Sequence, residues 1–101
     1  MQMVMLVFRS SLKERVHELL HQCEVHAFTE VNETVGYGQT GPAEGLAFYP
    51  GTNSVILVAL DDPALARVTK GVKAWHRQNA DHPGRQKPSI RVFTWPCSQI
   101  V

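Results

Sequence analysis

Two short segments that are apolar on both faces constrain this chain more than any other feature. Residues 4–8 and 55–58 are unbroken apolar runs of strand length, rich in β-branched side chains. A strand with one solvated face alternates between apolar and polar residues instead. The two runs therefore predict the central strands of a sheet.

The strands expected from the hydrophobic pattern cover residues 3–9, 26–37, 54–60 and 89–95. The second of them is partly polar and alternating, as suits an edge strand. Glycines and prolines predict loops at residues 39–53 and 80–88.

Two amphipathic helices are expected between these strands. Residues 12–23 have helical apolar spacing, and Ser10 or Ser11 is the expected N-cap. The second helix runs to about residue 79 and begins at Asp61-Asp62-Pro63, which fits an aspartate cap with proline at the first helical position. Gly71 interrupts its pattern, and glycine is a weak helix former.

The resulting β-α-β-β-α-β order predicts an α+β fold, the ferredoxin-like βαββαβ sandwich. Such a sandwich has an antiparallel four-stranded sheet with two helices on one face. We expect one domain over residues 1–101, a length suited to one core. The helices leave the other face bare, an apolar patch on the order of several hundred Å². We expect self-association through that face; the alternative is that residues 39–53 fold back over it.

Composition excludes some classes of function. The net charge is +1, which argues against a nucleic-acid binder. Membrane insertion is not expected, because no apolar stretch approaches the roughly 20 residues of a span. The apolar start of the chain lacks the basic residues and cleavage site of a signal peptide. Two cysteines give no disulfide framework, so a cytoplasmic protein is expected.

Two segments resemble the PII signal-transduction family. Residues 28–31 (Phe-Thr-Glu-Val) lead into residues 35–41 (Val-Gly-Tyr-Gly-Gln-Thr-Gly), similar to the strand that ends in a Gly-aromatic-Gly turn at the base of the family's T-loop. Residues 91–96 (Arg-Val-Phe-Thr-Trp-Pro) are similar to its last core strand. The resemblance implies a non-enzymatic, nucleotide-binding homotrimer. In such proteins an effector, usually an adenine nucleotide, occupies clefts between subunits, and the T-loop controls a partner such as a transporter or an enzyme.

The ligand-binding residues expected on this basis are Gly36, Tyr37, Gly38, Gln39, Arg85, Lys87 and Arg91. Gly36 and Gly38 can adopt positive φ and let backbone N–H groups approach a phosphate, and the Gln39 amide can bond a base or a carboxylate. The alternative is that Gly36-Tyr37-Gly38 is only a tight turn. Residues 83–91 hold one glycine where the family's phosphate loop has several, so a smaller or different anion is an equal candidate.

Residues 17–21 (His-Glu-Leu-Leu-His) match the H-E-x-x-H pattern of zinc proteases. The helical wheel places the motif away from the apolar stripe, on a solvated face without the cleft that zinc hydrolysis requires. The motif leaves an alternative function, a metal-responsive trimer resembling the CutA-like proteins, which would use His17, His21 and the methionines at positions 1, 3 and 5. Our main interpretation of the sequence is that the protein is not an enzyme and has no metal site.

Overall fold

The computed structural model describes residues 1–37, 51–80 and 89–101. Its elements are β1 (Gln2–Arg9), η1 (Ser10–Leu12), α1 (Lys13–Gln22), β2 (Thr29–Gly36), β3 (Gly51–Leu60), α2 (Asp62–Ala80) and β4 (Ile90–Pro96). The predicted order of strands and helices is confirmed, with β2 beginning three residues later and β3 three residues earlier than expected.

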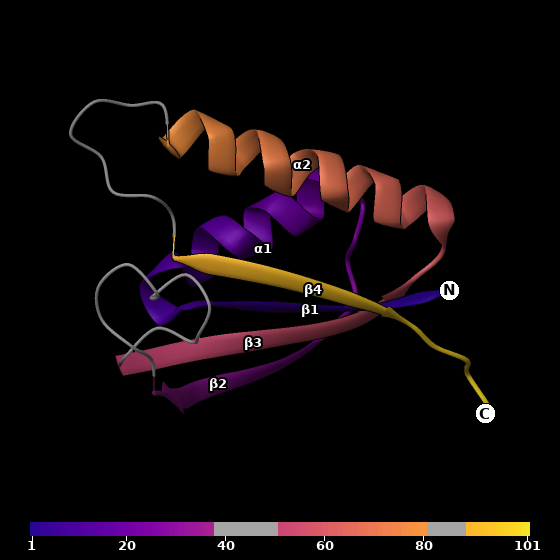
Figure 1. The fold of residues 1–101 in the computed structure, drawn as a ribbon, viewed down its shortest axis with the longest axis horizontal. Coiled ribbons are helices and arrows are strands. Elements are labelled where there is room, and N and C mark those ends of the chain that lie inside the picture. The colour runs from indigo at the N-terminus through magenta and orange to yellow at the C-terminus, as the bar shows by residue number, and fades with distance from the viewer. Residues whose placement is uncertain (38–50, 81–88) are drawn as a thin grey trace.

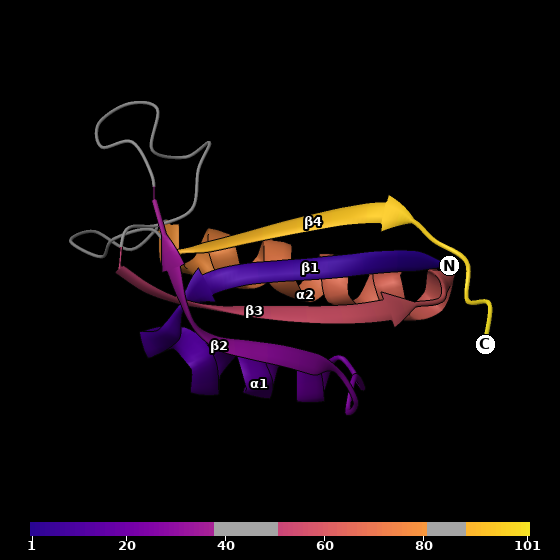
Figure 2. The same ribbon diagram turned by 90° about the horizontal axis from the view of Figure 1, so that it is seen from below.

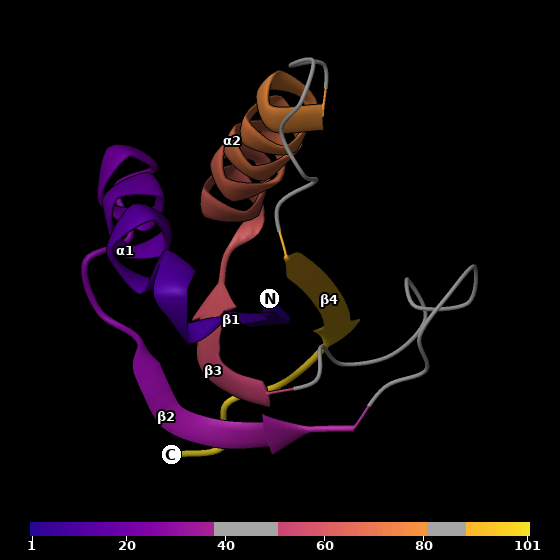
Figure 3. The same ribbon diagram turned by 90° about the vertical axis from the view of Figure 1, so that its left-hand side faces the viewer.

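The four strands form one antiparallel sheet in the order β2-β3-β1-β4. The strand β1 lies at the centre, where Leu6 pairs with Ile56 of β3 on one side and with Val92 of β4 on the other. Both helices cover one face, α1 over the β2 side and α2 over the β4 side (Figures 1 and 3). The predicted ferredoxin-like sandwich is therefore confirmed.

The core lies between this face and the helices. Alternate residues of β1 point into it, namely Val4, Leu6 and Phe8, each fully buried. From the helices come Val16, Leu20 and Val68, also buried. The predicted apolar stripes of both helices therefore face the sheet, as burial of their apolar surface requires.

The start of α1 differs from the prediction. Ser10 and Ser11 belong to the 3₁₀ turn η1, and Leu12 takes the N-cap position of α1 without a side-chain hydrogen bond. The Ser10 hydroxyl instead lies 3.2 Å from Ser54 Oγ on β3, and Ser54 donates to Asn32 Oδ1 on β2 at 3.3 Å. The prediction of a serine N-cap was wrong, because the Ser10 hydroxyl forms its hydrogen bond with Ser54 on the neighbouring strand instead.

The start of α2 confirms the aspartate cap and corrects its register. Asp61 Oδ1 accepts the Ala64 N–H at 3.0 Å, and the Asp61 carbonyl accepts the Leu65 N–H at 2.9 Å. Asp61 is thus the N-cap. Pro63 follows as the second helical residue rather than the first.

The glycine inside α2 allows the two helices to meet. A Cβ atom at Gly71 would lie 2.8 Å from Cys23 Sγ and 3.3 Å from Leu19 Cδ1. Cys23 is buried, as predicted, and its burial raises the pKa of the thiol, an effect that the nearby Arg67 charge opposes in part. Gly71 is therefore a close-packing position, which its low helix propensity alone did not reveal.

Candidate functional site

The expected ligand residues that the structure describes lie at one end of the sheet, on opposite edges. Gly36 closes β2 and pairs with Gly51, whereas β4 begins with Ile90, which pairs with Phe8 at the end of β1. Since β3 and β1 lie between, the strands that carry Gly36 and Arg91 are three inter-strand steps apart, or roughly 14 Å. Within one chain, the described residues Gly36 and Arg91 therefore lie apart.

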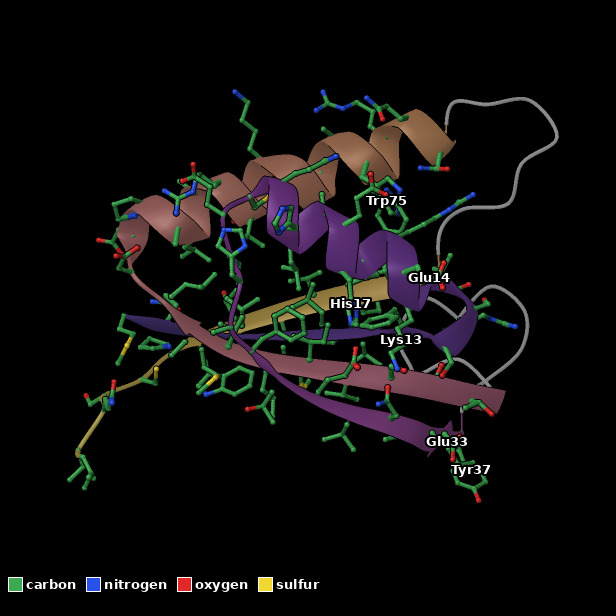
Figure 4. The ribbon with its side chains drawn as sticks, turned by 180° about the vertical axis from the view of Figure 1, so that it is seen from behind. Lys13, Glu14, His17, Glu33, Tyr37 and Trp75 are labelled. Atoms are coloured by element: carbon green, nitrogen blue, oxygen red, sulfur yellow. The ribbon has the colours of Figure 1, made fainter. Side chains whose placement is uncertain are left out.

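Of the expected residues on the β2 side, Gly36 is buried in the sheet and Tyr37 is 86% exposed. Figure 4 shows Tyr37 extending past the end of β2 into solvent. Gly38 and Gln39 lie outside the described residues, so the Gly-aromatic-Gly turn stays a prediction.

On the β4 side, Arg91 is half-buried and pairs with Val7, on the face of the sheet that the helices leave bare. Its Nη1 donates to the Ile90 carbonyl at 3.1 Å. Arg85 and Lys87 lie outside the described residues. Of the three basic residues expected to bind the ligand, Arg91 is the one that the structure describes. Its guanidinium group is suited to binding a phosphate or a carboxylate.

A β-bulge that sequence reasoning missed directs the end of β2. The pairing with β3 shifts between Val31 and Thr34, and Glu33 adopts a left-handed φ of 57° there. The Thr34 hydroxyl donates to the Asn53 carbonyl at 2.9 Å and holds the shifted strand. Bulges bend a strand and re-aim the residues beyond them, here Gly36 and Tyr37. Glutamate gives no sequence signal for such a conformation.

Figure 2 shows the face of the sheet that the helices leave bare. The side chains on this face are mostly apolar, as predicted. We call it the open face; its side chains alternate with those of the core along each strand. Val31 is 47%, Phe93 45% and Trp95 41% exposed. The apolar residues of the open face are Met3, Met5, Val7, Val31, Val55, Leu57, Ala59, Phe93 and Trp95. Of the alternative cover, residues 39–53, the last three belong to β3, and residues 39–50 lie outside the described residues.

The first histidine of the H-E-x-x-H segment contacts the sheet, although its side chain stays 37% exposed. His17 Nε2 lies 2.6 Å from Glu30 Oε1 on β2, and Lys13 Nζ lies 3.6 Å from the other carboxylate oxygen. Figure 4 shows Lys13 and His17 on the side of α1 nearest the strands. Burial alone would raise the pKa of Glu30, but the His17 hydrogen bond and the positive charges of His17 and Lys13 together hold that pKa below its ordinary value.

Glu30 engages the Nε2 of His17, one of the two histidines that the CutA-like alternative would use to bind a metal ion. Within residues 1–37, 51–80 and 89–101, no cluster of three or more histidine, cysteine or acidic side chains could hold a metal ion. The methionines at positions 3 and 5 lie on the open face, where they contribute to its apolar surface.

A groove of about 430 Å³ lies between α2 and the edge strand β4. Its floor is apolar, from Val4, Val68 and Ile90, and Lys73 and His76 stand on its α2 wall. The hydrophobic pattern did not predict this groove, because the groove is lined by α2, β1 and β4, which are far apart in the sequence.

In the part of the chain that the structure describes, no helix is long and apolar enough to span a membrane.

The fold and the distribution of these residues define a ferredoxin-like sandwich with an apolar open face. No protein-family model matches the chain, and no curated protein matches it in sequence. Solved structures do match. The chain is similar to CPII, a nitrogen regulatory PII-like protein from Thiomonas intermedia K12, in its apo form, with 14% identity, a TM-score of 0.63, and coverage of 93% of this chain and 85% of that one.

CPII bound to ADP, AMP and bicarbonate matches at 15% identity and a TM-score of 0.64, over 92% of this chain and 86% of that one. A protein from Thermus thermophilus of the PII-like signalling class matches at 16% identity and a TM-score of 0.56, over 93% and 83% of the two chains. The chain therefore has the fold of the PII-like proteins, as the resemblance in its sequence implied.

Proposed function

We propose that this protein is a non-enzymatic, cytoplasmic regulator of the PII-like type. It assembles as a homotrimer, binds a small anionic effector in the clefts between subunits, and controls a partner protein such as a transporter or an enzyme. An adenine nucleotide and bicarbonate are the first effectors to consider. The observation that carries this proposal is the position of the described ligand residues on opposite edges of the sheet.

Association through the open face has a physical driving force. Nine apolar side chains of the described residues lie on that face. Val7 is already buried in the isolated chain, whereas the two aromatic residues remain more than 40% exposed. Buried apolar area contributes roughly 25 cal/mol per Å², so covering even a few hundred Å² of it favours association by several kcal/mol before entropy losses. A heterologous contact that closes on itself gives a ring of copies.

Such a ring would complete the ligand site. When the β2 edge of one copy approaches the β4 edge of the next, Gly36 and Tyr37 come beside the neighbour's Arg91-bearing strand. Gly38 and Gln39 would then extend the same side of the cleft, and Arg85 and Lys87 the other. Backbone N–H groups and a guanidinium would face one anion, the combination that stabilises phosphate and carboxylate groups.

The known ligands of CPII supply the test compounds. A solved structure of CPII is bound to ADP, AMP and bicarbonate, which says what that protein binds. For this chain, residues 83–91 hold a single glycine, so a phosphate cradle of several glycines is not expected. Bicarbonate or a monophosphate is therefore as strong a candidate as a longer nucleotide.

A thermal-shift panel tests the proposal. The wild-type chain is heated with ATP, ADP, AMP, cyclic dinucleotides and bicarbonate, singly and in pairs. A ligand at 100 times its Kd stabilises the folded state by about 2.7 kcal/mol, which gives a rise in Tm of several degrees. Arg91→Ala should abolish the rise, while Arg15→Ala, an exposed arginine on α1, should retain it. If no compound shifts Tm at saturating concentration, the proposed effector class is wrong.

A further inference from the structure

The C-terminus of α1 reverses the chain sharply. The Glu24 N–H donates to the His21 carbonyl at 3.0 Å, and the Val25 N–H donates to the Leu20 carbonyl at 2.8 Å. Glu24 is left-handed, with φ of 63°. These two bonds are those of a Schellman motif, and Val25 and Leu20 are buried as its apolar contact. The cap fixes where the chain goes next.

The next residue after this cap is His26, and the reversal returns it to the last turn of α1. The rings of His21 and His26 lie with their centroids 4.7 Å apart in an edge-on arrangement. Both residues are exposed. His17, one helical turn earlier, has its Nε2 engaged with Glu30. The two neighbouring imidazoles at this place are therefore five residues apart, a spacing that the H-E-x-x-H pattern would not pair.

We propose that His21 and His26 together bind one divalent transition-metal ion, with Cu²⁺ the strongest binder. Imidazole nitrogen is a common ligand of copper, zinc and nickel, and Cu²⁺ stands highest in the affinity order of the divalent series. Exposed rings can rotate about their side-chain bonds to turn one nitrogen each toward a shared ion, and water completes the coordination.

The backbone around His21 and His26 fixes the positions of the two residues relative to each other. The hydrogen bonds of the cap and the burial of Val25 hold the two Cα positions, so binding immobilises only two side chains. Preorganisation of this kind raises affinity by reducing what must be ordered. The second imidazole is then present at a high effective concentration once the first has bound.

The metal site is separate from the proposed effector cleft. His26 precedes β2, whereas Gly36 and Tyr37 lie at its far end, and the eight residues of β2 extend roughly 25 Å. Loss of metal binding and loss of effector binding can therefore be observed independently. The site does not depend on the proposed function.

The test is a titration of the full chain with CuCl₂, followed by calorimetry and by electron paramagnetic resonance. His21→Ala and His26→Ala should each weaken Cu²⁺ binding by at least about tenfold, because each removes the chelating partner of the other. The nitrogen hyperfine pattern should change from two imidazoles to one. His76→Ala, on α2, is the matched control and should bind like the wild type.

Two results would overturn the assignment. One is a His26→Ala chain that binds Cu²⁺ as tightly as the His76→Ala control. The other is a His17→Ala chain that loses as much affinity as His21→Ala, which would mean that the helical pair binds the ion. Each variant is checked for an unchanged far-UV circular dichroism spectrum, and His26→Gln, which keeps a polar side chain of similar size, replaces His26→Ala if that spectrum changes.

Discussion

The contact between the two helices at Gly71 gives a sharp test of the packing. In Gly71→Ala, the new methyl carbon would lie 2.8 Å from Cys23 Sγ and 3.3 Å from Leu19 Cδ1. Non-bonded heavy atoms settle at about 3.5–4.0 Å, so the sulfur and the methyl must separate by roughly 1 Å. Cys23 has little freedom to yield, because it is buried and its thiol faces the Arg67 carbonyl at 3.5 Å.

Two opposing terms set the magnitude. Alanine gains about 1 kcal/mol over glycine in a helix interior. Inserting a methyl group into a packed contact costs about 1–3 kcal/mol. We therefore expect Gly71→Ala to lower the free energy of unfolding by about 1 kcal/mol. Ala66→Gly, at an exposed position of the same helix, measures the propensity term separately and should cost about 1 kcal/mol.

Urea unfolding followed by circular dichroism measures these changes, at one protein concentration because oligomer stability depends on it. Combining Gly71→Ala with Cys23→Ala removes the clashing sulfur, so the double variant should be more stable than the sum of the single effects by about 1–2 kcal/mol. If Gly71→Ala alone raised stability by the full propensity gain, there would be room for the methyl group and the described helix contact would be wrong.

Two further predictions concern single side chains of α1 and β2. Glu30→Gln should lower the free energy of unfolding by about 1–2 kcal/mol at pH 7, because it removes a charge-assisted bond to His17. Since the pKa of Glu30 is lowered in the folded chain, its stabilising effect is complete above the ordinary carboxyl pKa and is lost as pH falls through the lowered value. Urea unfolding at a series of pH values should therefore show the difference between the variant and the wild type at pH 7, and that difference should shrink as pH falls below the ordinary carboxyl pKa. Glu24→Gly should raise stability by about 1 kcal/mol, because glycine adopts the left-handed conformation of the helix cap without strain, and the bond it loses to Arg67 is an exposed pair at 3.7 Å. A fall in Tm for Glu24→Gly would refute that interpretation of the cap.

The fold could be predicted from the sequence because local patterns specify it. The apolar runs at residues 4–8 and 55–58 require burial on two sides, and helices that cover one face leave the open face bare whatever the details. The features that could not be predicted depend on contacts between segments. Ser10 does not cap the helix because its hydroxyl bonds to Ser54 on β3, and His17 contacts the sheet because its ring bonds to Glu30 on β2. A helical wheel includes neither of these partners, because both lie on strands.

The candidate site was predictable only in part for the same reason. The positions of Gly36 and Arg91 at one end of the sheet follow from strand order and antiparallel pairing. The β-bulge depends on the positive φ of Glu33, and the contact between the His21 and His26 rings depends on the positive φ of Glu24. A glutamate in the sequence does not predict a positive φ. Gly38, Gln39, Arg85 and Lys87 lie outside the described residues, and their role in a ligand site stays a prediction.

The most direct test of the account is the molar mass of the chain in solution, measured by light scattering during size-exclusion chromatography. The proposed site exists only where two edges of neighbouring copies meet, and the open face is covered only by association. The proposed homotrimer has about three times the 11.3 kDa of one chain, and that mass is the expected result. A mass of one chain across the concentration range would contradict both the covered open face and the effector cleft.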